Sequence, residues 1–399
     1  MVCRGVQLPD VPVRTVVCLP VHTGLPYDAV TASHSPSDHV SGTRATGTRD
    51  VVMRVFAQTD VGRSRQHNED TFLVANLETG AHLTFTDQPA ELTAAGHGVL
   101  FLVADGMGGA ASGELASSMA ATLVLDALTT SWQGASPSPQ VFAEALRDAT
   151  LLANARIHQH AQENPEHRGM GTTVTIAGLL GDRLFLVQVG DSRAYLVRDG
   201  QVQQLTKDQS LMQRLVEAGE ITAEQAEVSE RRNIILQALG PESQVTIDLT
   251  HQQLRRGDTL ILCSDGLSGV VRASEIVRIT QSEQDVRAIC SRLIDRANVL
   301  GGPDNITVIA ARFDGSALHA TATGDTFGYN AYPLVNTLNA QPPEAAPPPA
   351  PTQSAEQAVV LGAPAPVIAD RRRAVQPVLL ALGLVAGIAA IWLLVALFS

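Results

Sequence analysis

The sequence predicts an α+β domain built on antiparallel sheet, and three features support this fold class. Between residues 53 and 312, apolar runs with the period of strands alternate with runs of helical period. Two pairs of β-rich runs are separated only by Gly181-Asp182 and by Asp199-Gly200, as in tight hairpins. The helical runs place apolar residues three and four positions apart. We therefore expect one layered domain over residues 53–314.

The individual elements follow from these patterns. The two hairpins join residues 172–180 to 183–189 and residues 194–198 to 201–205. Helices are expected over residues 114–128, 142–162 and 284–297. No period repeats between these elements, so a repeat architecture is not indicated.

The charge balance of the 399-residue chain excludes two classes of function. Its 28 basic and 40 acidic residues give a net charge of −12, so a broad surface for nucleic acid is not expected. Every basic residue except Lys207 is arginine, and Lys207 lies in neither a phosphate-cradling Gly-Lys-Ser/Thr loop nor a kinase strand motif. Nucleotide-driven phosphoryl transfer is therefore excluded as well.

The four cysteines are scattered along the chain and form no Cys-x-x-Cys pair. They are Cys3, Cys18, Cys263 and Cys290. Neither a disulfide scaffold nor a zinc knuckle is indicated, and a reducing compartment fits best. Cys263 lies inside an apolar run, where a small buried side chain is expected rather than a nucleophile.

The C-terminal end predicts a membrane anchor. Residues 378–398 are 21 consecutive positions without a charge, and as a helix they would be about 31 Å long, against a hydrocarbon core of about 30 Å. This run is too long and too apolar on every face for a buried core helix. We predict a single membrane-spanning helix within residues 374–399. Three arginines, 371–373, precede it and place the domain on the cytoplasmic side of the inner membrane.

Two further segments flank the predicted domain. Residues 315–373 are rich in proline and alanine and have no helical or strand period, so we expect a semi-extended linker. Residues 1–52 also lack a sustained period, and prolines interrupt their apolar patches, so no export signal is indicated. The sequence leaves open whether this segment is a disordered extension or the product of an upstream start codon.

Acidic residues recur where apolar β runs end. Asp105-Gly106 follows residues 99–104, and Asp265-Gly266 follows residues 260–264. Glu69-Asp70 and Asp304-Asn305 border two more apolar runs. A strand end holds a carboxylate rigidly, and the following glycine lets a carbonyl oxygen approach a ligand.

Such a set of oxygen ligands, without His or Cys at zinc spacing, selects magnesium, manganese or calcium. The loop of an EF-hand is absent from the sequence. Each Asp-Gly pair taken alone is also consistent with an ordinary turn. Gathered together without cations, however, these carboxylates would repel one another, so a fold that collects them needs a metal.

Seven motifs, in order over about 260 residues, identify a family resemblance. They are Arg65-Gln66-His67-Asn68-Glu69-Asp70, Ala104-Asp105-Gly106-Met107-Gly108-Gly109, Gly169-Met170-Gly171-Thr172-Thr173, Val189-Gly190-Asp191-Ser192-Arg193-Ala194, Leu205-Thr206-Lys207-Asp208-Gln209-Ser210, Cys263-Ser264-Asp265-Gly266-Leu267 and Gly302-Pro303-Asp304-Asn305-Ile306-Thr307. In these motifs the chain resembles the metal-dependent serine/threonine protein phosphatases of type 2C, in their bacterial form. The resemblance implies a four-layer αββα sandwich of two antiparallel sheets flanked by helices.

The resemblance also implies two divalent cations, Mn²⁺ or Mg²⁺, in a cleft at one edge of the sandwich. Their ligands would be Glu69, Asp70, Asp105, the backbone carbonyl of Gly106, Asp191, Asp265 and Asp304. By this resemblance Asp105 bridges both ions, and Asp265 and Asp304 complete one site. Glu69 and Gly106 complete the other, and Asp70 acts through water. Asp191 matches a position that helps to hold a third, weaker ion.

The chemistry of phosphate ester hydrolysis requires about 20 kcal/mol or more of catalysis. Two cations about 3.5–4 Å apart can activate a shared water and neutralise the phosphoryl oxygens. Arg65 is the natural bidentate clamp for the phosphate, with a surface salt bridge to a neighbouring acid as the alternative interpretation. Ser264 and Cys263 are interpreted as structural, because no covalent phospho-enzyme is required.

Two more features concern the surroundings of the site. Many eukaryotic relatives have histidine directly after the Asp-Gly pair as the proposed general acid, whereas this chain has Met107, which cannot donate a proton. His67 is nearby in sequence, but it is not assigned a role. Residues 211–229 correspond to the mobile flap of the family, and such loops shape the choice of substrate.

The leading hypothesis is a membrane-tethered phosphatase that removes phosphate from serine and threonine in proteins. Its partners would be phosphorylated proteins and the serine/threonine kinase that it opposes. Two alternatives are an inactive scaffold that binds phosphopeptides and a phosphatase of small phosphometabolites. The presence of all the matched carboxylates and of Arg65 argues against the scaffold.

Overall fold

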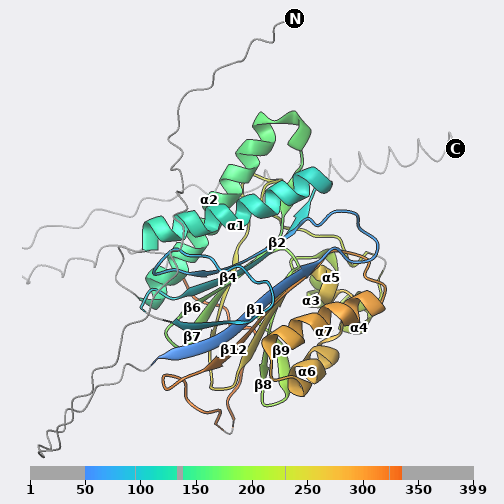
Figure 1. The fold of residues 1–399 in the computed structure, drawn as a ribbon. Helices are drawn as coiled ribbons and strands as arrows, with labels where there is room; N and C mark the ends of the chain where they lie inside the picture. The colour runs from blue at the N-terminus through green and yellow to red at the C-terminus, as the bar shows by residue number, and fades with distance from the viewer. Residues whose placement is uncertain (1–49, 95, 133–137, 230, 323, 335–399) are drawn as a thin grey trace, which may run out of the picture. The chain divides into compact units, whose positions relative to one another are not determined.

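The computed structural model describes residues 50–94, 96–132, 138–229, 231–322 and 324–334. Within these ranges the chain forms two antiparallel sheets with helices on their outer faces (Figure 1). The predicted extension up to residue 49, the predicted membrane helix and most of the predicted linker lie outside the described residues.

The first sheet has six strands, and each neighbouring pair is antiparallel. Its order is β3 (Ala90–Ala94), β1 (Val51–Asp60), β12 (Ile306–Asp314), β11 (Thr259–Cys263), β8 (Arg193–Arg198) and β9 (Gln201–Gln204). The central strands β11 and β12 are almost wholly buried, as expected for strands covered on both faces.

The second sheet is antiparallel as well. Its order is β10 (Asp248–Gln253), β7 (Arg183–Val189), β6 (Val174–Leu180), β4 (Val99–Met107) and β2 (Asp70–Asn76). The two-residue strand β5 (Gly171–Thr172) pairs with the last residues of β4.

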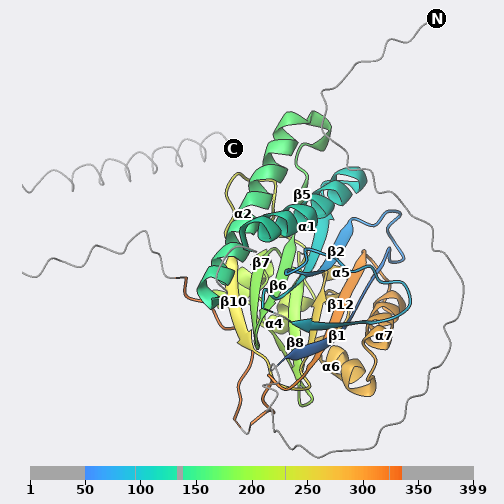
Figure 2. The same cartoon turned by 60° about the vertical axis from the view of Figure 1, so that its left-hand side comes forward.

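Helices cover both outer faces, as Figure 2 shows. The helices α1 (Ala110–Trp132) and α2 (Pro139–Glu163) pack on the second sheet, and α6 (Ala273–Ser282) and α7 (Val286–Val299) pack on the first. The short helices are η1 (Pro165–His167), α3 (Leu211–Glu217), α4 (Ala223–Glu227) and α5 (Asp265–Ser268). A third apolar core lies between the two sheets, with Phe101 and Phe313 edge-to-face at its centre. The prediction of two antiparallel sheets flanked by helices is therefore confirmed.

The predicted hairpins are both present. The second one turns at Asp199 and Gly200, whose φ angles of 47° and 77° are the positive values that a tight hairpin turn requires. Asp199 is the only non-glycine residue in the described ranges with a positive φ. The three predicted helices are present too, and each is longer than or shifted from its predicted range by a few residues. Helix α6 was not predicted.

The chain continues past β12 along the open edge of the domain. We call residues 315–322 and 324–334 the C-terminal strap. The backbone of His251 donates to the carbonyl of Asn330 (2.9 Å), and that of Tyr332 donates to Leu249 (2.8 Å), so the strap runs along β10. Leu318 is buried and Arg255 forms an ion pair with Asp325 at 2.6 Å. The predicted linker starts at residue 315, and these first residues of it pack on the domain.

Within the described part of the chain, none of the helices combines the length and the apolar character that crossing a bilayer requires.

Candidate metal and phosphate site

The second sheet positions two of the predicted ligands opposite each other. Asp70 is the first residue of β2, and in the antiparallel register it faces Asp105 near the end of β4. Three hydrogen bonds hold Asp105: its carbonyl accepts from the Thr173 amide and the Thr172 hydroxyl, both at 2.9 Å, and its own amide donates to Thr173 Oγ1 at 3.2 Å. Strand pairing therefore fixes both carboxylates at one end of the sheet.

The first sheet supplies two more carboxylates. Asp265 follows the buried strand β11, and Asp304 precedes β12, its neighbour in the sheet. Asp191 lies in the turn after β7 of the second sheet. Because these strands end at the same edge of the sandwich, residues far apart in sequence form one acidic cluster.

The pKa of Asp105 reflects its position inside this cluster of carboxylates. Burial raises the pKa of Asp105 well above its usual range, and the negative charges of the four surrounding aspartates raise the pKa further. These aspartates are Asp70, Asp265, Asp191 and Asp304. The structure thus brings together five of the predicted side-chain ligands.

Burial is also the largest cause of the raised pKa of Asp70, Asp191 and Asp265. It raises the pKa of Asp70 to about 7, although hydrogen bonds from Thr307 and Ser264 act in the opposite direction. Burial also raises the pKa of Asp191 and of Asp265, and their negative neighbours add to the shift. Burial and mutual repulsion disfavour the ionised form of these carboxylates. A nearby positive charge is therefore required to keep them ionised.

Orphaned oxygens test whether a cation fits these residues. Only four buried side-chain oxygen or nitrogen atoms in the described ranges have no hydrogen-bond partner. Three of them are Oδ1 atoms of the cluster, in Asp70, Asp191 and Asp265. Such atoms are rare in folded proteins because an unmet acceptor is costly, and a hard cation would satisfy all three.

No group of three or more His, Cys, Asp or Glu side chains in these ranges has the close arrangement of a complete metal site. The chemistry of the donors and their orphaned oxygens nevertheless fits Mn²⁺ or Mg²⁺. Such ions often keep several waters and need few side-chain ligands, so a loosely arranged set of carboxylates can still hold them.

A glycine cradle holds Glu69 beside the cluster. A Cβ atom at Gly106 would lie 2.1 Å from the carbonyl oxygen of Gly113, and a Cβ at Gly113 would lie 2.0 Å from Glu69 Oε2. Only glycine therefore allows the end of β4, the first turn of α1 and the Glu69 carboxylate to approach so closely. The Gly106 amide also donates to the Glu69 carbonyl at 3.1 Å. Glu69 and Gly106, which were predicted to hold the same ion, are thus close together in space.

Two buried polar residues that were not predicted as ligands, Asn305 and Ser264, position the ligands. The Asn305 side chain accepts from the Glu69 amide (2.8 Å) and donates to the carbonyls of Val61 and His67 (3.0 and 2.8 Å), which fixes the loop before β2. The Ser264 hydroxyl donates to Asp70 Oδ2 at 2.7 Å and accepts from the Thr307 amide at 3.0 Å. Ser264 is therefore structural, as predicted, and it joins the two sheets.

Arg65 lies at the open side of the cluster. Its Nη2 atom donates to Asp304 Oδ2 at 2.8 Å, and this bond raises the pKa of the guanidinium. The Arg65 side chain is 49% exposed, which leaves donors available to a ligand. The ion pair considered as an alternative is therefore present, at a place where the same side chain can also reach a phosphate.

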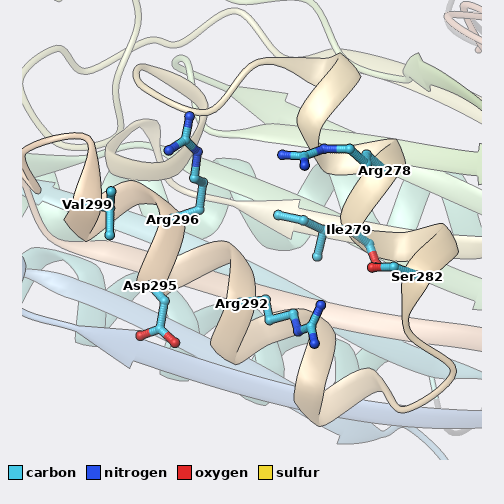
Figure 3. Close-up of a pocket in the computed structure, with 7 residues that line it drawn as sticks. All are labelled: Arg278, Ile279, Ser282, Arg292, Asp295, Arg296 and Val299. Atoms are coloured by element: carbon cyan, nitrogen blue, oxygen red, sulfur yellow. The ribbon is translucent and has the colours of Figure 1, made fainter.

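A surface pocket of about 460 Å³ lies elsewhere, between α6 and α7 (Figure 3). Its lining residues are Arg278, Ile279, Ser282, Arg292, Asp295, Arg296 and Val299. None of them is a predicted site residue. Its three arginines are already paired with glutamates, Arg278 and Arg296 with Glu275 and Arg292 with Glu283. The acidic cluster, and not this pocket, has the chemistry of an active site.

Comparisons with known proteins agree with this geometry. The profile of the family described as Protein phosphatase 2C matches residues 86–301. A serine/threonine phosphatase stp of Listeria monocytogenes is 36% identical over 264 residues, which are 66% of this chain and 96% of that protein. The serine/threonine protein phosphatase PstP of Mycobacterium tuberculosis is 38% identical over 262 residues, 65% of this chain and 45% of that protein.

A solved structure adds the metal. The crystal structure of the catalytic domain of PstP in complex with two manganese ions is 35% identical and covers 66% of this chain and 99% of its own, with a TM-score of 0.54. Sequence, fold and the acidic cluster all lead to one conclusion: this chain belongs to the protein phosphatase 2C family.

Proposed function

We propose that this chain hydrolyses phosphoserine and phosphothreonine in proteins at the acidic cluster, with two Mn²⁺ or Mg²⁺ ions as cofactor. The chain is a serine/threonine protein phosphatase by its family membership and by the names of its relatives. One observation of the structure carries the site: three of the four orphaned buried polar atoms in the described ranges are carboxylate oxygens of this cluster. The two ions of the related PstP structure support the metal content.

The residues that would hold the ions are those of the cluster. We propose that Asp105 lies between the two ions, that Asp265 and Asp304 hold one, and that Glu69 and the Gly106 carbonyl hold the other. When bound, such ions lower the pKa of water and neutralise charge on phosphoryl oxygens. We further propose that Asp70 acts through water and that Asp191 serves a third, weaker site.

Arg65 is proposed to bind the phosphate of the substrate. A guanidinium presents parallel N–H donors that match two phosphoryl oxygens. In the structure it donates to Asp304, and a bound cation would compete for that carboxylate and release the guanidinium. The rigid hydrogen bonds of Asn305 keep the loop that carries Arg65 beside the cluster.

Protonation of the leaving alkoxide is not assigned to a side chain. Met107, which follows Gly106 in β4, has no proton to give. His67 lies on an exposed loop and its carbonyl is used by Asn305. We propose that a metal-bound water or another group of the site protonates the leaving alkoxide.

The test is a metal-titrated assay on defined peptides with phosphothreonine, phosphoserine or phosphotyrosine. We expect hydrolysis of the first two that depends on Mn²⁺, and a loss of at least about a thousandfold in Asp105→Asn, whose fold is retained. Preference for small phosphate esters over phosphopeptides would support a metabolite phosphatase. Tight binding of phosphopeptides without hydrolysis would support a scaffold. Full activity of Asp105→Asn would remove Asp105 from the mechanism.

We also propose that the C-terminal residues anchor the enzyme in the inner membrane with its domain on the cytoplasmic side. The support is the uncharged run at 378–398 and the arginines that precede it. A serine/threonine kinase acting on the same substrates is the proposed functional partner. Deletion of residues 371–399 should yield an active enzyme that no longer fractionates with membranes. Continued membrane fractionation of the truncated enzyme would contradict the anchor.

A further inference from the structure

The predicted flap, residues 211–229, continues into residues 231–235; we call these two described ranges the flap, and they begin and end beside the acidic cluster. The Leu211 amide donates to the Ile234 carbonyl at 2.9 Å, so the two ends of the flap are fastened together. Immediately before it, the Gln209 amide donates to the Gly190 carbonyl (2.8 Å), and the Gly190 amide donates to Gln209 Oε1 (3.0 Å). Since Gly190 precedes Asp191, the flap is attached to the turn that carries a cluster carboxylate.

The body of the flap is weakly held. Among the described residues, two ion pairs join its side chains to the rest of the domain, Lys207 with Glu217 at 3.4 Å and Arg272 with Glu227 at 3.5 Å. All four side chains are about half exposed or more. Met212 is the only buried hydrophobic residue of the flap. Segments with so few buried contacts open at low free-energy cost, so a single extra contact can change how often the flap is closed.

Lys207 provides such a contact, because its side chain touches both the strap and the flap. Its ammonium lies 4.4 Å from the centroid of the Tyr329 ring, at the same time as it pairs with Glu217 of α3. Tyr329 belongs to the strap and is itself fixed, because its hydroxyl donates to Asp248 Oδ1 at 2.9 Å. One side chain therefore links the strap to the flap, and it is the only lysine in the chain.

The alternative is that Lys207 is an ordinary solvated surface lysine and that its contacts with Tyr329 and Glu217 have no functional effect. An exposed ion pair alone contributes little because solvent screens it, and a cation over an exposed aromatic face adds a similarly small stabilisation. The two contacts share one cation and act on a marginally held segment, so together they are large enough to matter. Because the bond to Asp248 fixes Tyr329, the Tyr329 ring holds Lys207 where it pairs with Glu217.

We propose that Lys207, seated on Tyr329 of the strap, is a positioning residue that holds the flap beside the active site and so sets the affinity for phosphoprotein substrates. This inference rests on the proposed function. A phosphopeptide extends beyond its phosphate and must meet the flap, whereas a small aryl phosphate needs only the acidic cluster. The contribution therefore appears in the KM for peptides and not in the hydrolysis of the small ester.

The experiment uses the full chain with saturating Mn²⁺, a phosphothreonine peptide and p-nitrophenyl phosphate. Lys207→Met and Tyr329→Leu should each raise the KM for the peptide about three- to tenfold, which corresponds to about 0.7–1.4 kcal/mol. Both should leave p-nitrophenyl phosphate hydrolysis within about twofold of wild type, because the cluster is untouched. Lys207→Arg keeps a cation over the ring and should stay near wild type for both substrates.

Three controls separate positioning from general damage. Arg278→Met removes one exposed cation from the pocket of Figure 3 and should leave the hydrolysis of both substrates unchanged. Lys207→Met/Glu217→Gln should be no worse than Lys207→Met, because both residues belong to one contact. Hydrogen exchange of the flap amides should be faster in Lys207→Met and unchanged in Lys207→Arg.

The outcomes are distinct. A peptide KM in Lys207→Met equal to wild type would overturn the inference, and so would equal losses for both substrates or equal losses in Lys207→Arg. Absence of Mn²⁺-dependent hydrolysis of either substrate by the wild type would instead contradict the proposed function.

Discussion

Strand β11 is bounded by two aspartates with opposite surroundings. Asp258 precedes the strand, is fully buried, and accepts from Arg198 through both of its oxygens, at 2.8 and 2.6 Å, and from the Arg255 amide at 2.7 Å. Asp265 follows the strand, and its Oδ1 atom is buried without a hydrogen-bond partner. The same strand thus ends in a satisfied carboxylate on one side and an unsatisfied one on the other.

The neighbouring strand shows the same asymmetry. Arg198 ends β8, beside the start of β11, while Arg193 at the other end of β8 is engaged by Asp208 with donor distances of 2.6–3.0 Å. A basic side chain is therefore present near the cluster, but another carboxylate already holds it. The domain can therefore pair a buried aspartate completely, yet it leaves one oxygen of Asp70, Asp191 and Asp265 without a partner, where we propose that a cation binds.

Removing the cation from the satisfied end should have the largest effect on stability. Arg198→Met leaves Asp258 buried without its partner, so we expect the free energy of unfolding to fall by about 3–5 kcal/mol. Urea unfolding followed by circular dichroism measures this loss. In Arg198→Met/Asp258→Leu, which removes both charges, much of the stability should return. A loss of less than about 1 kcal/mol in the single variant would mean that the pair is not the stabilising contact we take it for.

Supplying a cation to the unsatisfied end should have the next largest effect. Mn²⁺ at 100 times its dissociation constant should raise the free energy of unfolding by about 2.7 kcal/mol, because it binds only the folded cluster. Thermal unfolding with and without Mn²⁺ measures this gain. Asp105→Asn should show little of it, whereas Arg198→Met should keep it in full. An identical Mn²⁺ gain in Asp105→Asn would place the ion elsewhere.

A pH series of the metal-free protein sharpens the contrast. In the unfolded chain Asp70 releases its proton near pH 3.8, but in the folded protein its pKa is raised to about 7. Between these values the folded state binds more protons, so this group lowers stability as pH rises, by at most about 1.4 kcal/mol per pH unit. Unfolding free energies of wild type and Asp70→Asn from pH 4 to 7 isolate this contribution. The difference between them should change in this window; a constant difference would contradict the raised pKa.

The cluster end of β11 could be predicted from the sequence, whereas the pair of Asp258 with Arg198 was not predicted. Asp105-Gly106 and Asp265-Gly266 end apolar runs, and strand pairing then brings their carboxylates to one edge, as observed. The turn at Asp199-Gly200 was equally clear, because its residues suit positive φ angles. These features depend on residues close together in the sequence, so short sequence patterns are sufficient to predict them.

Other features depend on contacts between distant residues. Asn305 fixes the loop before β2 across 238 positions of sequence, and nothing in its neighbourhood signals that partner. The strap was predicted to be part of the linker, yet Tyr332 and Asp325 attach it to β10 and to Arg255. Such segments gain their order from the surface that receives them, which a period in their own sequence cannot reveal.

The smallest predicted effect has the opposite sign from most mutations. Asp105→Asn removes a carboxyl group whose pKa is raised by burial and by the four surrounding aspartates, and an amide keeps the shape of the side chain. We expect the metal-free variant to be more stable than wild type by about 1 kcal/mol at pH 7, although it has lost its activity. Urea unfolding in a chelator measures the difference, with Asp258→Asn as the matched control at the satisfied end of β11. The Asp258→Asn control should be destabilised, because the charge of Asp258 is paired with Arg198. A loss of stability in both variants would contradict the proposed difference between the paired and the unpaired end of β11.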